Sequence, residues 1–142
     1  MNVEKPDWLE QMEGILETLN EGVLIADDCQ RVLFLNERME RLLGLPRAAV
    51  VGKTAESIYK GVDYEFLQKQ SARGREQGHN RFEFFVPRPD GSRVSVIVSA
   101  RDVEDPDGRL FAVVTFTDIT EQKRAEQSLR DANVQLERRA EE

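Results

Sequence analysis

Two proline–aspartate–glycine turns divide the last third of the chain and constrain its fold more than any other sequence feature. They are R-P-D-G-S at residues 88–92 and D-P-D-G at residues 105–108. In such a turn proline fixes φ, aspartate hydrogen-bonds its own backbone and glycine accepts a positive φ, so the chain reverses. The segments around the turns, at 82–86, 93–100 and 109–117, are rich in Val and Phe. Three strands joined by two reversals predict an antiparallel meander.

Two further strands are predicted earlier in the chain. Residues 22–26 and 32–35 are β-prone runs, and the polar segment D-D-C-Q-R separates them. This pattern is typical of a hairpin. With the meander it gives five antiparallel strands.

Short helices are predicted between the hairpin and the meander. Asn36 is a typical N-cap for a helix at residues 37–43, and Gly44 ends that helix. A helical turn follows Pro46, and a broken helical pattern fills residues 53–78. The predicted fold class is therefore α+β.

Alternation along the strands assigns their faces. In residues 93–100 one face is apolar and is the expected core face; it consists of Val94, Val96, Val98 and Ala100. The final strand has two largely apolar faces, Ala112, Val114 and Phe116 on one and Phe111, Val113 and Thr115 on the other. A strand that is apolar on both sides has to be covered on both sides. We expect the middle helices to cover one face, and the N-terminal helix or a second protomer to cover the other.

An amphipathic helix of about twelve residues is predicted at the N-terminus. Asp7 followed by Glu10 has the form of a capping box, and the helix should end near Asn20 and Gly22. Its apolar stripe, a candidate docking or dimer surface, consists of Trp8, Leu9, Met12, Ile15, Leu16 and Leu19. The first 28 residues hold eight acidic residues and one basic residue, which together account for the chain's net charge of −7.

The C-terminal segment predicts a helix with a coiled-coil seam. Apolar residues recur there at spacings of four, three and four; they are Ala125, Leu129, Ala132 and Leu136. A helix of about 20 residues with alanine at half of its seam is marginal alone in water. We favour a parallel coiled-coil linker, with a solvated single helix as the alternative.

Several motifs together resemble those of PAS domains, the sensor modules of bacterial signalling proteins. They occur in the family's order from about residue 19 to residue 121: E-G-V-L-I-A-D-D at 21–28, V-L-F-L-N at 32–36, R-L-L-G at 41–44, V-G-K at 51–53, P-D-G-S at 89–92 and T-D-I-T-E at 117–121. The resemblance implies a five-stranded antiparallel sheet with short helices over one face, and a ligand, if there is one, between the two. One position departs from the family, which often has a small residue where this chain has Arg38.

The resemblance also implies a signal-relay corner. Asp118 and Thr120 lie where the last strand would become the output helix. In this position Asp118 is expected to accept hydrogen bonds across the junction, and Thr120 to cap the start of the helix.

Composition excludes several classes of function. A nucleic-acid binder needs a basic stripe, but this chain has 20 Lys and Arg residues against 27 Asp and Glu residues. The single cysteine, Cys29, excludes an intrachain disulfide framework and any Cys-based zinc or iron–sulfur site, and no metal site is predicted. His79 is the only imidazole and is expected in a solvated loop, so no Ser/His/Asp or Cys/His set with a plausible base is predicted. Without a signal pattern or an apolar run of membrane length, we expect a cytoplasmic chain with no membrane contact.

The expected interior between sheet and helices is apolar. The ligand-pocket candidates are Tyr59, Tyr64, Phe66, Phe82, Phe84, Val96, Val98, Val114 and Phe116. We expect no cofactor and favour a filled core over a specific pocket, since these strands offer few polar groups; any ligand should be small and largely apolar. A haem or flavin sensor is the alternative, although His79 is expected in a loop and Cys29 in a turn.

The prediction is a non-catalytic sensory and dimerisation module. Its parts are a helix at 1–20, a PAS domain at 21–120 and a coiled-coil output linker at 121–142. A change in the core would pass through the Asp118–Thr120 corner to a C-terminal effector domain of histidine kinase or cyclase type. The expected assembly is a homodimer.

Overall fold

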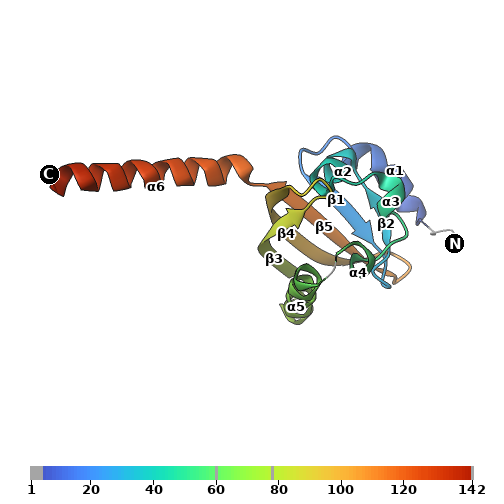
Figure 1. Cartoon of the computed structure of the whole chain (residues 1–142). Coiled ribbons are helices and arrows are strands. Elements are labelled where there is room, and N and C mark those ends of the chain that lie inside the picture. Colours follow the sequence, from blue (N-terminus) through green and yellow to red (C-terminus); the bar gives the residue numbers. More distant parts are fainter. Residues whose placement is uncertain (1–4, 60, 78, 142) are drawn as a thin grey trace.

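A computed structural model describes residues 5–59, 61–77 and 79–141 of the chain, and it has the predicted α+β architecture (Figure 1). The N-terminal half contains α1 (Asp7–Leu16), β1 (Gly22–Ala26), β2 (Val32–Leu35), α2 (Glu37–Leu43), α3 (Arg47–Val50) and α4 (Ala55–Ile58). The C-terminal half contains α5 (Val62–Gln77), β3 (His79–Pro87), β4 (Arg93–Glu104), β5 (Leu110–Asp118) and α6 (Thr120–Glu141). The expectation that His79 lies in a loop is wrong for its backbone, which begins β3, while its side chain lies outside the described part.

The five strands form one antiparallel sheet in the order β2-β1-β5-β4-β3, so the predicted hairpin and meander are both confirmed. The two proline–aspartate–glycine segments are its reversals. Gly91 and Gly108 have φ values of 87° and 82°, which residues with a Cβ rarely adopt. The Asp105 carboxylate accepts from the backbone N–H of Arg109 at 2.9 Å, which closes the second turn. Because both turns are tight, consecutive strands pair along most of their length.

Asn36 joins three elements at the start of α2 and is the N-cap that the sequence predicts. Its Oδ1 accepts from the backbone N–H groups of Met39 and Val23, both at 3.0 Å. Its Nδ2 donates to the carbonyls of Leu16 and Glu21, also at 3.0 Å. The side chain is fully buried, and it is satisfied because it links the end of α1, the start of β1 and the first turn of α2.

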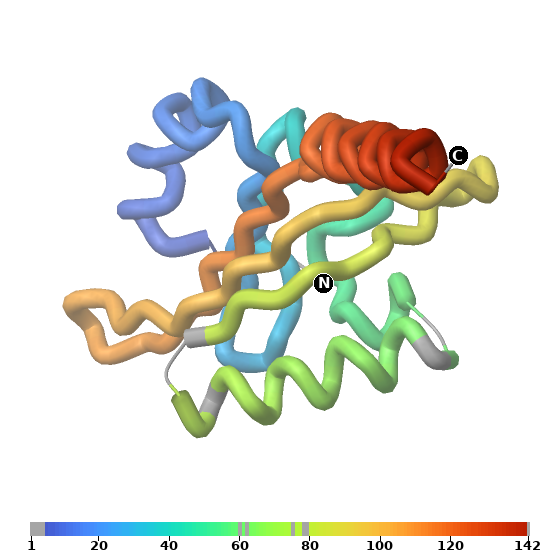
Figure 2. The backbone as a smooth tube through the Cα atoms, turned by 90° about the vertical axis from the view of Figure 1, so that its left-hand side faces the viewer, coloured from blue at the N-terminus to red at the C-terminus, as the bar shows by residue number. Residues whose placement is uncertain are grey.

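Two apolar cores lie on opposite faces of the sheet. Helices α2 to α5 cover the larger core, whose buried strand residues are Val32, Leu35, Phe84, Val86, Val94, Val96, Val98 and Phe116. Helix α1 covers the smaller core, which consists of Leu9, Val23, Ile25, Leu33, Phe34 and Phe111 with Trp8, Leu16 and Val113 at its edge. Figure 2 shows α1 and α5 on opposite sides of the strands. The two apolar faces of β5 are therefore both covered, the outer one by α1 of the same chain.

The N-terminal helix differs from its prediction at both ends. Pro6 is the N-cap and no side chain caps the helix, so the predicted box of Asp7 and Glu10 does not form. The helix ends at Leu16 rather than near Asn20, because the Asn36 amide donates to the Leu16 carbonyl that a continuing helix would use.

The predicted apolar stripe of α1 is divided between core and surface. Leu9 is fully buried, and Trp8 and Leu16 pack at the edge of the smaller core. Ile15 is 57% exposed, and Met12 and Leu19 are also exposed. Leu19 lies beyond the helix end, which turns it out of the predicted register.

Helix α6 extends away from the domain (Figure 1). None of its described residues is buried, and Leu129 on the predicted seam is 64% exposed. Among the described residues, no helix combines the length and the apolar character needed to cross a membrane.

Candidate functional site

A hollow of about 650 Å³ lies between the sheet and helices α4 and α5. Its apolar wall is built by Leu24, Ala26, Val32, Leu43, Ala55, Ile58, Leu67, Phe82, Val98, Ala100, Leu110, Ala112, Val114 and Phe116. Phe111 also borders it, although its side chain belongs to the smaller core. Tyr59, Ser71 and Asn80 line it as well. The hollow has the volume of a typical small-molecule site, so the larger core is not filled throughout by its own side chains.

The structure separates the nine pocket candidates into five that line the hollow and four that do not. Those that line the hollow are Tyr59, Phe82, Val98, Val114 and Phe116. Phe84 and Val96 are buried in the larger core instead. Phe66 is 37% exposed and stacks on Phe84, and the Tyr64 hydroxyl accepts from Gln68 Nε2 at 3.0 Å.

Several lining residues were not among the candidates. Leu24 lies on the same face of β1 as Ala26, and Leu43 and Leu67 come from α2 and α5. Period-two alternation along residues 22–26 carries the signal for Leu24. Leu67 has no comparable signal, since α5 is only weakly amphipathic.

Helix α5 closes the hollow by packing against β3. The Phe66 ring stacks on Phe84 with centroids 5.9 Å apart and meets Phe82 edge-on at 5.6 Å. Near the other end, the Asn80 amide donates to the Gln70 carbonyl. A Cβ at Gly74 would lie 2.7 Å from the Cβ of Asn80, so glycine permits this close approach.

Tyr59 lies in the wall between this hollow and a second one of about 380 Å³, which Asp63 and Arg88 also line. Its ring meets Phe84 edge-on at 5.8 Å. Its hydroxyl oxygen is buried and has no hydrogen-bond partner among the described residues. Burial, and secondarily the Asp63 carboxylate, raise the pKa of the phenol well above its usual range, so the hydroxyl remains a proton donor.

The strand β5 passes from the hollow directly to α6. Val114 and Phe116 line the hollow, and Asp118 ends the strand. Asp118 Oδ1 accepts from the Thr120 backbone N–H at 2.8 Å and from the Thr120 hydroxyl at 2.6 Å. The expectation that Thr120 caps α6 is therefore wrong, because Asp118 supplies the accepting oxygen.

Two residues, Ile119 just before α6 and Lys123 in its first turn, attach this end of the helix to the sheet. Ile119 is buried, and its backbone N–H donates to the Ser95 carbonyl at 3.0 Å. Lys123 Nζ lies 3.1 Å from the Glu83 carboxylate on β3. The first turn of α6 is thus held to β4 and β3, whereas the rest of the helix makes no buried contact.

Arg38, the residue that departs from the PAS pattern, faces this corner from α2. Its Nη2 lies 3.8 Å from Asp118 Oδ2. Burial alone would raise the pKa of Asp118. The hydrogen bonds from Thr120 and the positive charges of Arg38 and Arg88 outweigh it and hold the pKa below its usual value.

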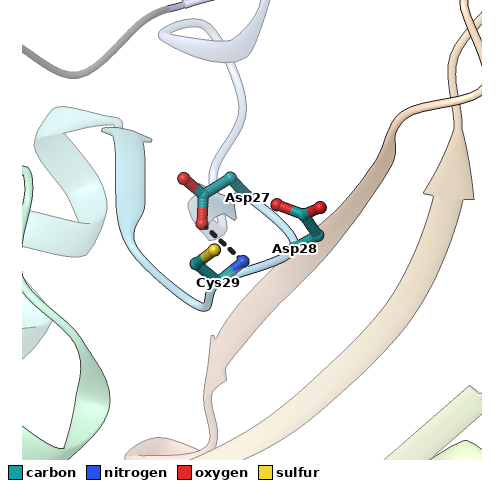
Figure 3. Close-up of side chains that lie close together, drawn as sticks. All are labelled: Asp27, Asp28 and Cys29. Carbon is teal, nitrogen blue, oxygen red and sulfur yellow. Dashed lines mark hydrogen bonds between the residues drawn. The ribbon is translucent and has the colours of Figure 1, made fainter.

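The only cluster of potential metal-ligand side chains in the described residues is Asp27, Asp28 and Cys29, at the β1–β2 turn (Figure 3). Asp27 Oδ1 accepts from the backbone N–H groups of Cys29 and Arg31, both at 2.9 Å. Such side-chain bonds to the following backbone are what shape an Asx turn. Cys29 is exposed in this turn, as expected, and does not line the hollow.

Comparison with known proteins connects this arrangement to a family. A family model described as "PAS domain" matches residues 20–121. A comparison with curated proteins gave no significant match.

Solved structures show the same fold at low sequence identity. A PAS domain from a two-component sensor histidine kinase has a TM-score of 0.63 and 16% identity, over 78% of this chain and 96% of its own. The PAS domain of a protein from Colwellia psychrerythraea has a TM-score of 0.68 and 18% identity, over 81% and 99%. An RNA-binding light-oxygen-voltage receptor has a TM-score of 0.65 and 15% identity, over all of this chain and 43% of its own.

At these identities the structural likeness establishes the fold alone, whereas the family model establishes descent. Because that model covers most of the chain, the protein belongs to the PAS family, the sensor domains of signalling proteins.

Proposed function

We propose that this chain is a non-catalytic sensory and dimerisation module that relays a change in the hollow to α6 and onward to a C-terminal effector domain. The observation that carries the proposal is the course of β5. One strand lines the hollow with Val114 and Phe116 and positions Asp118 at the start of α6. A ligand that moves the wall therefore acts on the same backbone that holds the output helix.

Helix α2 offers a second route between hollow and corner. Leu43 near its C-terminal end lines the hollow, and Arg38 near its N-terminal end faces Asp118. Arg88 also donates to the Arg41 carbonyl at 3.3 Å and to Ser92 Oγ at 2.9 Å, which ties α2 to the β3–β4 turn. A shift of α2 would change the charge around Asp118 without any movement of β5.

The proposed dimer joins two copies of α6 in parallel along Ala125, Leu129, Ala132 and Leu136. Leu129 and Leu136 are both more than 60% exposed, and a 22-residue helix with no buried residue is marginally stable alone. The exposed side chains of Met12 and Ile15 in α1, and of Leu19 just after it, would extend the contact between the two copies. The proposed effector is a histidine kinase or a cyclase, in the cytoplasm.

Sedimentation velocity of the full chain tests the dimer. The double substitution Leu129→Lys and Leu136→Lys should convert a dimer at tens of micromolar into a monomer. Dimerisation would then bury two lysine charges from each helix at the seam, which costs free energy. Val134→Lys is the matched control, since Val134 is exposed but lies off the seam. A wild-type chain that sediments as a monomer, or a Val134→Lys variant that dissociates equally, would contradict the proposal.

A cofactor-loaded light, gas or redox sensor is the second candidate function, and the likeness to a light-oxygen-voltage receptor favours it. The absorption spectrum of the purified chain separates the two. A flavin band in the blue or a Soret band supports the cofactor sensor. A colourless protein supports the proposed module with a colourless ligand.

A further inference from the structure

Two aspartates of this chain precede a glycine, and they occupy equivalent positions in the two proline–aspartate–glycine turns. Asp90 and Asp107 each lie between a proline and a glycine, and both are exposed. The backbone N–H groups of Gly91 and Gly108 each donate, at 3.0 Å, to the carbonyl three residues earlier. The local sequence and the turn are the same, so a difference in reactivity between the two aspartates has to come from their surroundings.

The Asp90 carboxylate is held within the first turn. Its Oδ1 accepts from the Ser92 backbone N–H at 2.9 Å and from the Ser92 hydroxyl at 2.6 Å. The bond from the hydroxyl, and secondarily the bond from the backbone, lower the pKa of Asp90 from its ordinary value. The turn is also tied to α2, because Arg88 donates to the Arg41 carbonyl at 3.3 Å. At neutral pH Asp90 is therefore ionised and fixed in an attached turn.

In the second turn a different aspartate makes the equivalent bonds. Asp105 Oδ1 accepts from the backbone N–H groups of Asp107 at 3.0 Å and Arg109 at 2.9 Å. Among the residues that the structure describes, no group donates a hydrogen bond to the Asp107 carboxylate. Its side chain is therefore able to rotate toward the backbone that follows it.

The second turn also lies at the tip of a two-stranded ribbon. The described β3–β4 ladder reaches Arg101 and the described β1–β5 ladder reaches Ala112, so residues 102–111 extend past both neighbouring strands (Figure 2). In this ribbon Val103 is 40% exposed and Leu110 is 52% exposed. A two-stranded ribbon is marginally stable by itself in water, so this tip should open more often than the first turn.

An aspartyl–glycyl sequence is able to rearrange without an enzyme. The glycine backbone nitrogen loses its proton and attacks Cγ of the protonated aspartate carboxyl. A C–N bond forms, a C–O bond breaks and water leaves, which gives a five-membered cyclic imide. Water then opens the imide at its other carbonyl, so the main chain runs through Cβ and the residue is isoaspartate. Glycine hinders the attack least because it has no Cβ.

This reaction uses no oxidant or other co-reactant, and its requirements separate the two turns. The carboxyl has to take up a proton and rotate toward the glycine nitrogen, and that nitrogen has to leave its hydrogen bond within the turn. Asp90 meets neither requirement while Ser92 holds it. Asp107 meets the first without losing a hydrogen bond to any described residue, and the second when the ribbon tip opens.

We propose that Asp107 is a modification site, at which the chain isomerises spontaneously to isoaspartate, and that the fold protects Asp90 in the same local sequence. Isomerisation lengthens the main chain before Gly108, so the bond from its N–H to the Asp105 carbonyl loses its geometry. The residue then bears an α-carboxylate as its side group. S-adenosylmethionine-dependent isoaspartyl methyltransferases esterify this group, and an enzyme of that class is the partner that fits the modified turn.

Ageing of the folded full chain in heavy-oxygen water at neutral pH tests the proposal. Each passage through the imide leaves a heavy oxygen atom in the peptide, and trypsin places the two turns in separate peptides, residues 82–93 and 102–109. Mass spectrometry with electron-transfer fragmentation then assigns the isoaspartate to a residue. Asp107 should isomerise at least about tenfold faster than Asp90, the net value of one hydrogen bond to a charged group. Equal rates, a faster Asp90 or no isomerisation would overturn the proposal.

Unfolding and one serine variant assign the difference to the structure. In concentrated urea the two sites should react at nearly equal rates, because both are proline–aspartate–glycine sequences. Ser92→Ala should speed the reaction at Asp90 severalfold in the folded chain and leave Asp107 unchanged. Ser99→Ala is the matched control, since Ser99 is an exposed serine of the same strand that lies outside both turns. A tenfold difference that persists in urea would contradict protection by the fold.

Methylation gives a second readout of the same site. An isoaspartyl methyltransferase with labelled S-adenosylmethionine should transfer methyl groups to the aged wild-type chain. It should transfer few to an aged Asp107→Glu variant, because the longer side chain closes the imide ring poorly. Equal methylation of the two aged chains would place the modification elsewhere and refute the assignment to Asp107.

Discussion

The two helical covers of the sheet differ in what lies beneath them. Helix α1 places the fully buried Leu9 in the smaller core, and Trp8 meets Phe111 edge-on at 5.2 Å. Helix α5 contacts β3 through the partly exposed Phe66 and through Asn80, and it borders a hollow of about 650 Å³. The α1 side of the sheet thus fully buries a leucine, whereas the α5 side borders a hollow.

The largest expected effect is on the free energy of unfolding, when one leucine of α1 and one of α5 are each replaced by alanine. Leu9→Ala should lower the free energy of unfolding by about 3 to 4 kcal/mol, because it opens a cavity at a fully buried position. Leu67→Ala removes the same atoms beside an existing hollow and should cost about 1 to 2 kcal/mol. Urea unfolding followed by circular dichroism measures both values. Equal losses would show that the two covers pack equally well.

Two glycine substitutions, one in α1 and one in α5, should change the free energy of unfolding by less and so refine the comparison of the two helices. A Cβ at Gly14 of α1 would meet no atom within 4 Å, so Gly14→Ala should stabilise the chain by about 0.5 to 1 kcal/mol through helix propensity. Gly74→Ala brings the same propensity but forces α5 away from Asn80. It should give no net gain and should speed hydrogen exchange in the second half of α5. A full propensity gain at Gly74 would mean that α5 moves outward at no cost.

The smallest expected effect concerns the corner between β5 and α6. Because the folded-state pKa of Asp118 is lowered, its charge contributes stability above about pH 4 that is lost as pH falls through the folded value. Solvent screening keeps this contribution on the order of a few tenths of a kcal/mol. The amide proton shift of Thr120, followed by NMR, should titrate with a midpoint below the ordinary 3.8 of an aspartate.

Two variants complete this titration. Arg38→Gln should move the midpoint upward, since it removes a positive charge near Asp118, and Arg41→Gln on the same helix is its control because Arg41 pairs with Glu37 instead. Asp118→Asn should abolish the transition. A midpoint unaffected by Arg38→Gln would remove the α2 route from the relay.

Most of the fold followed from short stretches of sequence. The caps at Asn36 and Gly44 and the two proline–aspartate–glycine turns depend on interactions within a few residues, so they marked the helix and strand boundaries correctly. The capping box at Asp7 failed although its pattern was good. Pro6 already adopts the extended backbone of an N-cap, and the helix began one residue earlier.

The candidate site was less predictable. Alternation found Phe82, Val98, Val114 and Phe116 because strand faces repeat every two residues. It also selected Phe84 and Val96, which share that face but lie in the filled part of the core. Alternation reports which face a side chain occupies and carries no information on whether the facing helix leaves space above it.

The sequence by itself therefore determined where the strands lie along the chain, the turns between them, the two apolar faces of β5 and the resemblance to the family. Only the tertiary structure decided which half of the α1 stripe is buried, where the hollow opens, and that Arg38 faces Asp118 across 80 positions of the chain. The physical reason is range. Turns and caps are closed by neighbours in sequence, whereas cavities and long-range charge pairs depend on how whole elements pack against one another.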